Sequence, residues 1–174
     1  MVKYSKAVFL DRDGVINKPI IYKHKPYSPR LIKEFKLIKN VKKAIKILKF
    51  KGYKIIIITN QPDAKLNSKI KKKIISINNK TKNILKIDKI YSCFHNDQDN
   101  CQCRKPKIGN ILKAKKKFKI NLKKSYFVGD RWKDIEAGRS SNCKTIFINY
   151  NYKEKKPKKY FMKVRSLYEF SKKI

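Results

Sequence analysis

The chain has 174 residues, the size of one domain, and carries 48 Lys and Arg against 12 Asp and Glu, a formal net charge of +36. A hydrophobic fraction of 41% is enough to bury a core, which argues against disorder despite that charge. The longest apolar run, Ile55–Ile58, is too short to cross a bilayer, and residues 1–5 contain no apolar signal region, so we expect a single cytoplasmic domain over 1–174.

Buried strands alternate with amphipathic helices along the chain. Short apolar runs bounded by turn residues predict strands at 7–10, 54–58, 89–93, 125–128 and 144–148. Apolar residues at helical spacing predict helices at 41–51, 66–85 and 109–118. This alternation predicts an α/β fold, a Rossmann-like parallel sheet flanked by helices, with a core over about 7–148 and no insertion long enough for a large cap domain.

The residues after Ile148 form a C-terminal extension, 149–174. We expect a surface excursion at the Lys- and Pro-rich residues 151–159 and a terminal helix at 164–170. Leu167 and Phe170 would pack that helix on the body of the domain. No Gly/Ser-rich linker and no internal repeat divides the chain, so the extension is assigned to the same domain.

Polar motifs follow four of the predicted strands. Asp11 follows the first strand, Thr59-Asn60-Gln61 the second, a Cys/His cluster the third and Asp130 the fourth. Ligands bind at the carboxyl ends of the strands in open parallel sheets. We therefore expect these four motifs to meet at one edge of the sheet.

Carboxylates are rare in this chain, yet four of its eight Asp residues lie in two of these motifs, as Asp11, Asp13, Asp130 and Asp134. Asp11, just beyond a buried strand, suits a carboxylate nucleophile, and Asp13 suits a general acid/base. Several carboxylates together predict Mg²⁺, the hard cation that such groups hold with a substrate phosphate. Taken singly, any one of these Asp residues is equally well explained as a turn or helix-capping residue.

Three of the four Cys residues and one of the two His residues fall within eleven positions, as Cys93, His95, Cys101 and Cys103. Three thiolates and one imidazole make a closed tetrahedral Zn²⁺ site, which predicts a structural metal. The alternative is unligated thiols beside a surface His. A zinc clamp directly before Arg104-Lys105 would form a rigid loop that aims both cations into the site. Cys143, the remaining Cys, is expected to be an inert buried thiol.

The motifs Asp11-Arg12-Asp13-Gly14, Thr59-Asn60-Gln61, Arg104-Lys105-Pro106 and Gly129-Asp130-Arg131 with Asp134 resemble, in this order, the four-motif signature of haloacid dehalogenase (HAD) superfamily phosphatases. The resemblance runs from about residue 7 to 148. The zinc loop makes the chain most similar to the branch that contains heptose 1,7-bisphosphate phosphatase and histidinol-phosphate phosphatase. The family's HAD fold and phosphomonoester hydrolysis are therefore expected here.

The resemblance also implies a mechanism. Asp11 attacks phosphorus to form an aspartyl-phosphate, while Asp13 protonates the leaving alkoxide and then activates water. Mg²⁺ is held by the Asp11 carboxylate, the Asp13 backbone carbonyl and Asp130, and Asp134 is an outer-shell partner. Thr59 and Lys105 neutralise charge on the transferring phosphoryl group.

The residues that the resemblance places near the substrate are Asn17, Tyr22, Asn60, Gln61, Arg104 and Arg131. The sequence departs from the heptose enzymes in two loops. Pro62-Asp63-Ala64-Lys65 stands where they have a Gly-rich turn, and Pro19 stands where they have an acid. The zinc loop is also short, closer in length to that of the histidinol-phosphate group. These loops choose the leaving group, so the reaction is better determined than the sugar.

Three functions are compatible with the sequence. The first is an Mg²⁺-dependent phosphatase for a small sugar phosphate, foremost D-glycero-D-manno-heptose 1,7-bisphosphate in the synthesis of lipopolysaccharide or surface-polysaccharide precursors. The second keeps the chemistry but acts on histidinol phosphate or a polynucleotide 3′-phosphate. The third is a non-catalytic, zinc-containing polyanion-binding protein, which leaves the clustered Asp residues unexplained.

The charge itself does not select among these functions. Of the 48 cations 42 are Lys, with 25 Ile and 14 Asn, the pattern of A/T-rich coding, so compositional bias explains it better than selected nucleic-acid binding. Nucleic acid is therefore a less favoured partner than a small phosphorylated sugar, and no membrane partner is expected. Without an obvious association stripe, we expect a monomer.

Overall fold

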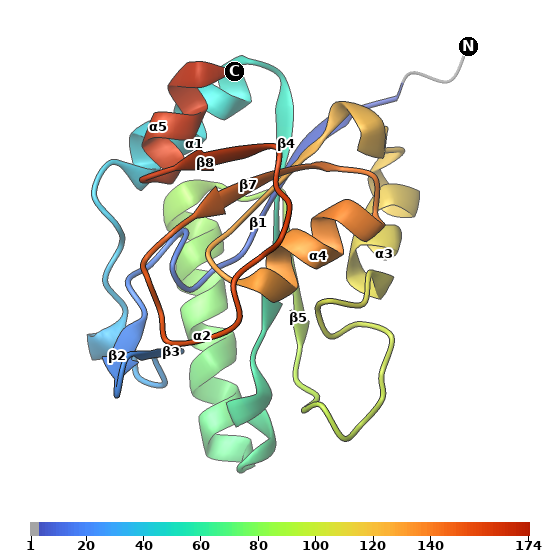
Figure 1. The fold of residues 1–174 in the computed structure, drawn as a ribbon. Coiled ribbons are helices and arrows are strands. Elements are labelled where there is room, and N and C mark those ends of the chain that lie inside the picture. Colours follow the sequence, from blue (N-terminus) through green and yellow to red (C-terminus); the bar gives the residue numbers. More distant parts are fainter. Residues whose placement is uncertain (1–3) are drawn as a thin grey trace.

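The computed structural model describes residues 4–174 and has a six-stranded sheet at its centre (Figure 1). The strand order is β5-β4-β1-β6-β7-β8, and each pair of neighbours is parallel. The strands are β1 (Lys6–Leu10), β4 (Tyr53–Asn60), β5 (Lys89–Cys93), β6 (Tyr126–Gly129), β7 (Lys144–Ile148) and β8 (Met162–Val164). The Rossmann-like parallel fold expected from the sequence is confirmed.

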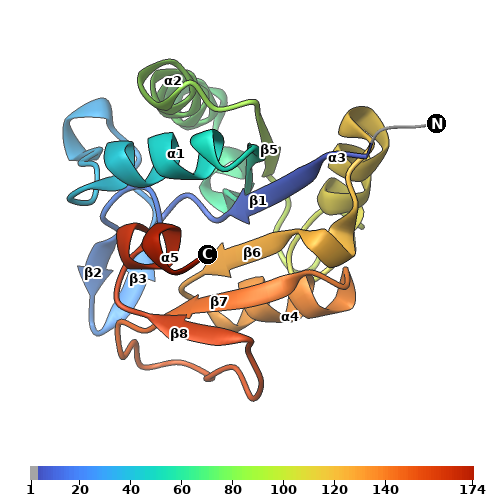
Figure 2. The ribbon, with the colours of Figure 1, turned by 90° about the horizontal axis from the view of Figure 1, so that it is seen from above.

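Helices cover both faces of this sheet (Figure 2). The helices are α1 (Val41–Phe50), α2 (Ser68–Leu85), α3 (Gly109–Phe118), α4 (Trp132–Ser140) and α5 (Leu167–Lys173). One face packs against α1, α5 and the end of α2, and the other packs against α3 and α4. The run Ile55–Ile58 is buried throughout because alternate residues enter opposite cores, as a strand covered on both faces requires.

The predicted strands and the first three helices lie where expected, within one or two residues at each end. Three further elements were not predicted. They are α4, the short edge strand β8, and an antiparallel hairpin of β2 (Ile20–Tyr22) and β3 (Lys25–Tyr27). Three-residue strands are too short to show an alternating pattern. Short 3₁₀ segments lie at Ile32–Glu34, Pro62–Lys65 and Leu122–Lys124.

The C-terminal extension differs from expectation at two points. The helix expected at 164–170 begins at Leu167, because Ser166 caps it by accepting a hydrogen bond from the Glu169 N–H at 3.1 Å. Residues 151–159 form no helix or strand, but Tyr152 within them is buried, so this segment is not purely a surface excursion. No helix in the described part, 4–174, is long and apolar enough to cross a membrane.

Candidate active site

Three of the four motifs expected at one edge lie together at the carboxyl ends of the neighbouring strands β4, β1 and β6, and the Cys/His motif forms a separate cluster at the end of the next strand, β5. Thr59 is the penultimate residue of β4, Asp11 directly follows β1, and Asp130 directly follows β6. The Asp11 N–H donates to the Val128 carbonyl at 3.0 Å, so the sheet ladder between β1 and β6 continues as far as the site. The strand ends therefore fix the backbone that carries the polar side chains.

Two glycines make room for carboxylates of the site. Gly14 has φ of 89°, and a Cβ built there would overlap the Asp130 carboxylate. A Cβ at Gly129 would overlap the Asp134 side chain. A larger residue would therefore displace the Asp130 carboxylate at position 14 and the Asp134 side chain at position 129.

Lys105 contacts two of the acidic groups, Asp11 and Asp134. Its Nζ lies 2.8 Å from Asp11 Oδ1 and 2.6 Å from Asp134 Oδ1, and it donates to the Ile58 carbonyl at 2.7 Å. The ammonium is buried, which lowers its pKa, but attraction to Asp11 and Asp134 outweighs burial and raises the pKa above its usual value. Lys105 is therefore a fixed positive charge in the middle of the site.

The acidic cluster has the composition of a divalent-cation site. Asp11, Asp130 and Asp134 each offer a carboxylate oxygen within 4.8 Å of the others, and three buried carboxylates face the single ammonium of Lys105. Burial chiefly, with repulsion from Asp134 and Asp13, raises the pKa of Asp11 to about 6 despite the attraction of Lys105. The pKa of Asp130 is raised well above its usual value, first by burial and then by Asp134 and Asp11. A bound cation would remove this repulsion.

The free oxygens show which carboxylates suit direct coordination. Asp134 uses Oδ1 for Lys105 and Oδ2 to accept from the Arg131 N–H at 3.0 Å, which caps helix α4. By contrast, Asp130 Oδ1 is buried without a hydrogen-bond partner among residues 4–174. These contacts fit Asp130 as a direct ligand and Asp134 as an outer-shell partner.

Asp13 is held apart from that cluster by its own donors. Arg12 binds it in a bidentate pair, with Nε and Nη2 each 3.1 Å from a carboxylate oxygen, and Asn17, Ser28 and Gln61 donate to it at 2.7–2.9 Å. Burial raises the pKa of Asp13, but Arg12 and these donors outweigh it and lower the pKa below its usual value. The ionised form of Asp13 is therefore the stable one.

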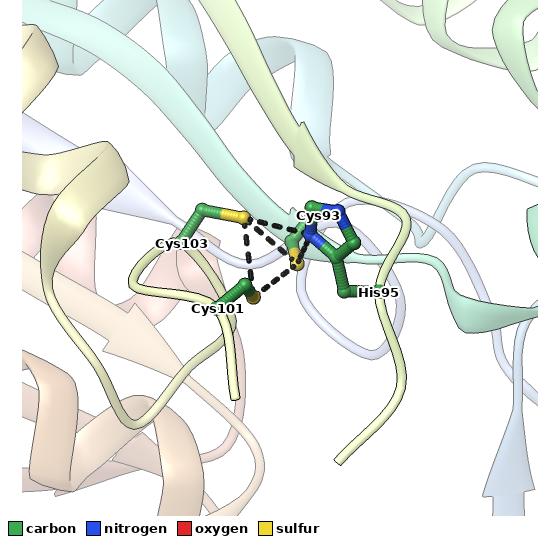
Figure 3. Close-up of side chains that lie close together, drawn as sticks. All are labelled: Cys93, His95, Cys101 and Cys103. Carbon is green, nitrogen blue, oxygen red and sulfur yellow. Dashed lines mark hydrogen bonds between the residues drawn. The ribbon is translucent and has the colours of Figure 1, made fainter. Parts of the chain in front are cut away.

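The Cys/His cluster predicted from the sequence is assembled at the end of β5 (Figure 3). The sulfurs of Cys93, Cys101 and Cys103 lie 3.1–3.6 Å apart, and His95 Nδ1 lies 3.3 Å from Cys103 and 3.6 Å from Cys93. A tetrahedron with Zn–S bonds has sulfur separations of about 3.8 Å, close to these values.

The three thiols of the cluster differ in pKa, because burial raises the pKa of Cys93 and of Cys103 while that of Cys101 is lowered. Burial raises the pKa of the Cys101 thiol, but hydrogen bonds from Cys103 and from the Arg104 and Cys103 backbone outweigh it and lower the pKa to about 6. Cys101 is thus set up to be a thiolate, the form that binds metal. Cys143 is buried elsewhere in the core, as expected, and burial raises its pKa to about 11.

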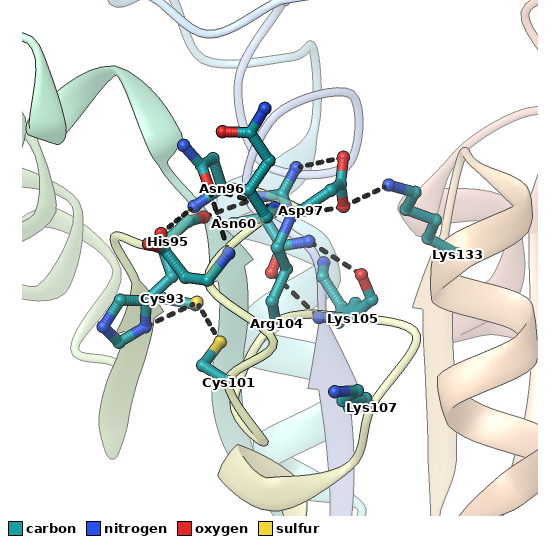
Figure 4. A network of polar contacts seen from close by, with 12 residues as sticks. Asn60, Cys93, His95, Asn96, Asp97, Cys101, Arg104, Lys105, Lys107 and Lys133 are labelled. Carbon is teal, nitrogen blue, oxygen red and sulfur yellow. Dashed lines mark hydrogen bonds and ion pairs between the residues drawn. The ribbon is translucent and has the colours of Figure 1, made fainter.

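Hydrogen bonds fix the two residues that follow the Cys/His cluster, Arg104 and Lys105 (Figure 4). Arg104 donates from Nη1 to the His95 carbonyl at 3.1 Å. The Asn60 amide, at the end of β4, donates to the Lys105 carbonyl and accepts from the Lys105 N–H, each at 3.1 Å. Asn60 therefore positions the backbone that delivers Lys105 to the site.

The residues predicted to contact substrate fall into three groups. Asn60, Arg104 and Arg131 line one cavity of about 530 Å³ beside the acidic cluster. Asn17 and Gln61 are fully buried and donate to Asp13, which places them behind it. Tyr22 is exposed on β2 and lines a different hollow, of about 270 Å³.

Three polar residues of the site were not singled out from the sequence. Arg12 is fully buried and donates to Asn78 of α2 at 2.8 Å as well as to Asp13. Tyr152, from the C-terminal extension, donates its hydroxyl to Asp130 Oδ2 at 2.8 Å. Ser28 lies 2.7 Å from Asp13. Only Arg12 had a sequence signal, its place between Asp11 and Asp13.

Known proteins are similar to this chain in both sequence and fold. Residues 17–142 match the haloacid dehalogenase-like hydrolase family. A D-glycero-α-D-manno-heptose-1,7-bisphosphate 7-phosphatase of Campylobacter jejuni is 35% identical over 95% of this chain and 93% of its own length. A D-glycero-β-D-manno-heptose-1,7-bisphosphate 7-phosphatase of Helicobacter pylori is 33% identical over 85% of each chain.

Among solved structures, the D,D-heptose 1,7-bisphosphate phosphatase of B. bronchiseptica, complexed with magnesium and phosphate, superposes with a TM-score of 0.82. The two chains are 21% identical, and the match covers 97% of each. At 21% identity this structural match shows that the two chains share a fold. The overall fold of this chain is therefore shared with a solved structure.

Proposed function

The chain belongs to the haloacid dehalogenase-like hydrolases and is a phosphoric monoester hydrolase, and we propose that it removes the C7 phosphate of D-glycero-D-manno-heptose 1,7-bisphosphate. The observation that carries the chemistry is the buried Asp11–Lys105 pair beside Asp130 at the sheet edge. The substrate is supported by the names of the relatives that match most of the chain. It would serve the synthesis of a heptose-containing surface polysaccharide.

The proposed reaction has two steps on Asp11. A carboxylate oxygen of Asp11 attacks phosphorus, the bond from phosphorus to the sugar oxygen breaks, and that oxygen takes a proton from Asp13. Water then attacks the aspartyl-phosphate and gives its proton to Asp13, which releases phosphate and restores Asp11. Lys105 and the Thr59 hydroxyl stabilise the charge on the phosphoryl oxygens in both steps.

Ser28 gives Asp13 a partner in both of its protonation states. When Asp13 is ionised, the Ser28 hydroxyl donates to it across 2.7 Å. When Asp13 is protonated, the same hydroxyl can accept, because a hydroxyl is both donor and acceptor. The other donors lower the pKa of Asp13, so its ionised form is favoured for taking the proton from water.

Two metals are proposed. The Asp11 carboxylate, the Asp13 backbone carbonyl and Asp130 would hold Mg²⁺, with Asp134 in its outer shell. Such a cation orients the phosphate and offsets the negative charge of the buried carboxylates. Cys93, His95, Cys101 and Cys103 would hold a structural Zn²⁺ that fixes the loop leading to Arg104 and Lys105.

Tyr152→Phe should weaken Mg²⁺ binding about threefold to tenfold, because Asp130 Oδ2 loses the donor that fixes its orientation. The measurement is a titration of the metal-free protein with Mg²⁺ by calorimetry. Tyr150→Phe is the matched control, because it removes a hydroxyl from the ring that stacks on Tyr152, with the two ring centroids 5.6 Å apart. Unchanged affinity in Tyr152→Phe would show that Tyr152 does not position Asp130.

A phosphate-release panel with Mg²⁺ tests the proposed substrate. It compares the α and β anomers of heptose 1,7-bisphosphate, because the relatives divide between them, with histidinol phosphate and a 3′-phosphorylated oligonucleotide. We expect the highest kcat/KM with one heptose anomer. A higher value with either of the other two substrates would replace the proposed substrate, while no hydrolysis of any would contradict the phosphatase.

A further inference from the structure

Five cations and three carboxylates line the cavity that contains Asn60, Arg104 and Arg131. Besides the two Arg residues it is lined by Lys25, Lys133 and Lys153. None of the three Lys residues was assigned a role from the sequence. A bisphosphate has one phosphate that reacts and one that does not, and the second also needs a cationic partner.

Asp97 marks the point in this cavity where two cations converge (Figure 4). Its Oδ1 accepts from Arg104 Nε at 2.8 Å and from Lys133 Nζ at 3.0 Å. The two cations come from separate elements, the loop before Lys105 and helix α4. Both hydrogen bonds, first that of Arg104 and then that of Lys133, lower the pKa of Asp97, so its carboxylate is an anion.

The three side chains differ in how firmly they are held. Asp97 is 70% exposed, whereas Arg104 is 14% and Lys133 22% exposed. Asp97 can therefore turn into water at little cost, while the two cations stay in place. A phosphate carries more charge and more acceptor oxygens than a carboxylate and would compete well for the same donors.

Arg131 provides a contrast within the same cavity. It is paired with Glu154, whose oxygens lie 2.6–3.1 Å from Arg131 Nε and Nη2. The Glu154 side chain is only 14% exposed. Arg104 also contacts Asp97 through two nitrogens, at 2.8 and 3.4 Å, but Asp97 is far more exposed than Glu154, so Arg104 and Lys133 are the more available pair of cations.

We propose that Lys133 is a specificity-determining residue which, together with Arg104, binds the non-reacting phosphate of the substrate at the position that the Asp97 carboxylate now occupies. Asp97 is then a competitor that the substrate displaces. The proposal rests on the proposed bisphosphatase function and deepens it. The neighbouring residues Arg104 and Lys105 then bind different phosphates. Lys105 contacts the reacting phosphate, and Arg104 contacts the remote one.

The test compares kcat/KM for heptose 1,7-bisphosphate with that for heptose 7-phosphate, which lacks the second phosphate. The ratio is kcat/KM for the bisphosphate divided by kcat/KM for the 7-phosphate. In Lys133→Met this ratio should fall about tenfold, which is the effect of losing one partly exposed charge-assisted hydrogen bond. In Asp97→Asn the ratio should rise severalfold, because the competing negative charge is gone. Lys123→Met, at a different cavity, is the control and should leave the ratio unchanged.

The opposite signs separate this proposal from a structural role. If Asp97 only braces Arg104, both variants lower the ratio, and the proposal is wrong. An unchanged ratio in Lys133→Met would also overturn it, while the wild-type protein still hydrolyses the bisphosphate and the proposed function stands. A wild-type protein that hydrolyses neither sugar would instead refute the proposed function and this inference with it.

Discussion

Asp11→Asn should lower kcat by about 10⁴-fold or more, because an amide cannot form the phospho-enzyme through which we propose the reaction proceeds. The Asp11 carboxylate lies 2.8 Å from Lys105 Nζ, in the cluster that it forms with Asp130 and Asp134. The measurement is phosphate release at saturating substrate and Mg²⁺. Glu136→Gln, a carboxylate-to-amide change on the exposed side of α4, is the control and should retain full activity.

The same variant should not lose stability in metal-free buffer. Burial raises the pKa of Asp11 from 3.8 to about 6, so the folded state disfavours its ionised form. That penalty is absent below about pH 4 and complete above about pH 6. The thermal midpoint of Asp11→Asn at pH 8 should therefore equal or exceed that of the wild type. A folded variant that keeps activity well above background would contradict the nucleophile assignment.

Cys101→Ser should cause the second large loss, with kcat at least about 100-fold lower and a lower thermal midpoint. Structural zinc contributes on the order of 10 kcal/mol to small zinc-dependent folds, so losing one of four ligands weakens the loop strongly. That loop delivers Arg104 and Lys105, and Lys105 is held against Asp11 at 2.8 Å. We therefore expect activity to fall although the proposed zinc would not touch the substrate.

Zinc content, measured by elemental analysis, should drop in Cys101→Ser together with turnover. Cys143→Ala is the matched control, because Cys143 is a free thiol in the core, outside the cluster. It should keep its zinc and its activity, with some loss of stability from the smaller side chain. If Cys101→Ser folds and turns over like the wild type, the cluster has no structural role.

Much of the sheet could be predicted because its strands are buried on both faces. Continuous runs such as Ile55–Ile58 and turn residues at their ends leave few alternatives. Helix α4 was missed because the residues that face the sheet include Ala137 and Gly138, which carry little apolar signal. Position 138 requires a glycine because a Cβ there would overlap Thr145. That contact is not visible in the sequence alone.

The candidate site was predictable where residues lie within one motif or directly follow a predicted strand. Cys93, His95, Cys101 and Cys103 are close in sequence, and their assembly follows from their spacing. The contact of Tyr152 with Asp130 joins positions 22 residues apart through an irregular segment, which no periodic pattern describes. The Asp97 contact with Lys133 spans 36 residues and depends on how a loop and α4 pack in three dimensions.

We propose that Asp11 and Lys105 serve the removal of one particular phosphate, the one on C7. The most direct measurement follows heptose 1,7-bisphosphate by phosphorus NMR in the presence of wild-type protein and Mg²⁺, beside an Asp11→Asn sample. We expect the C7 phosphate signal to be replaced by that of inorganic phosphate while the C1 signal persists, and neither signal to change with Asp11→Asn. Loss of the C1 phosphate instead, or no change with the wild type for either anomer, would contradict this proposal.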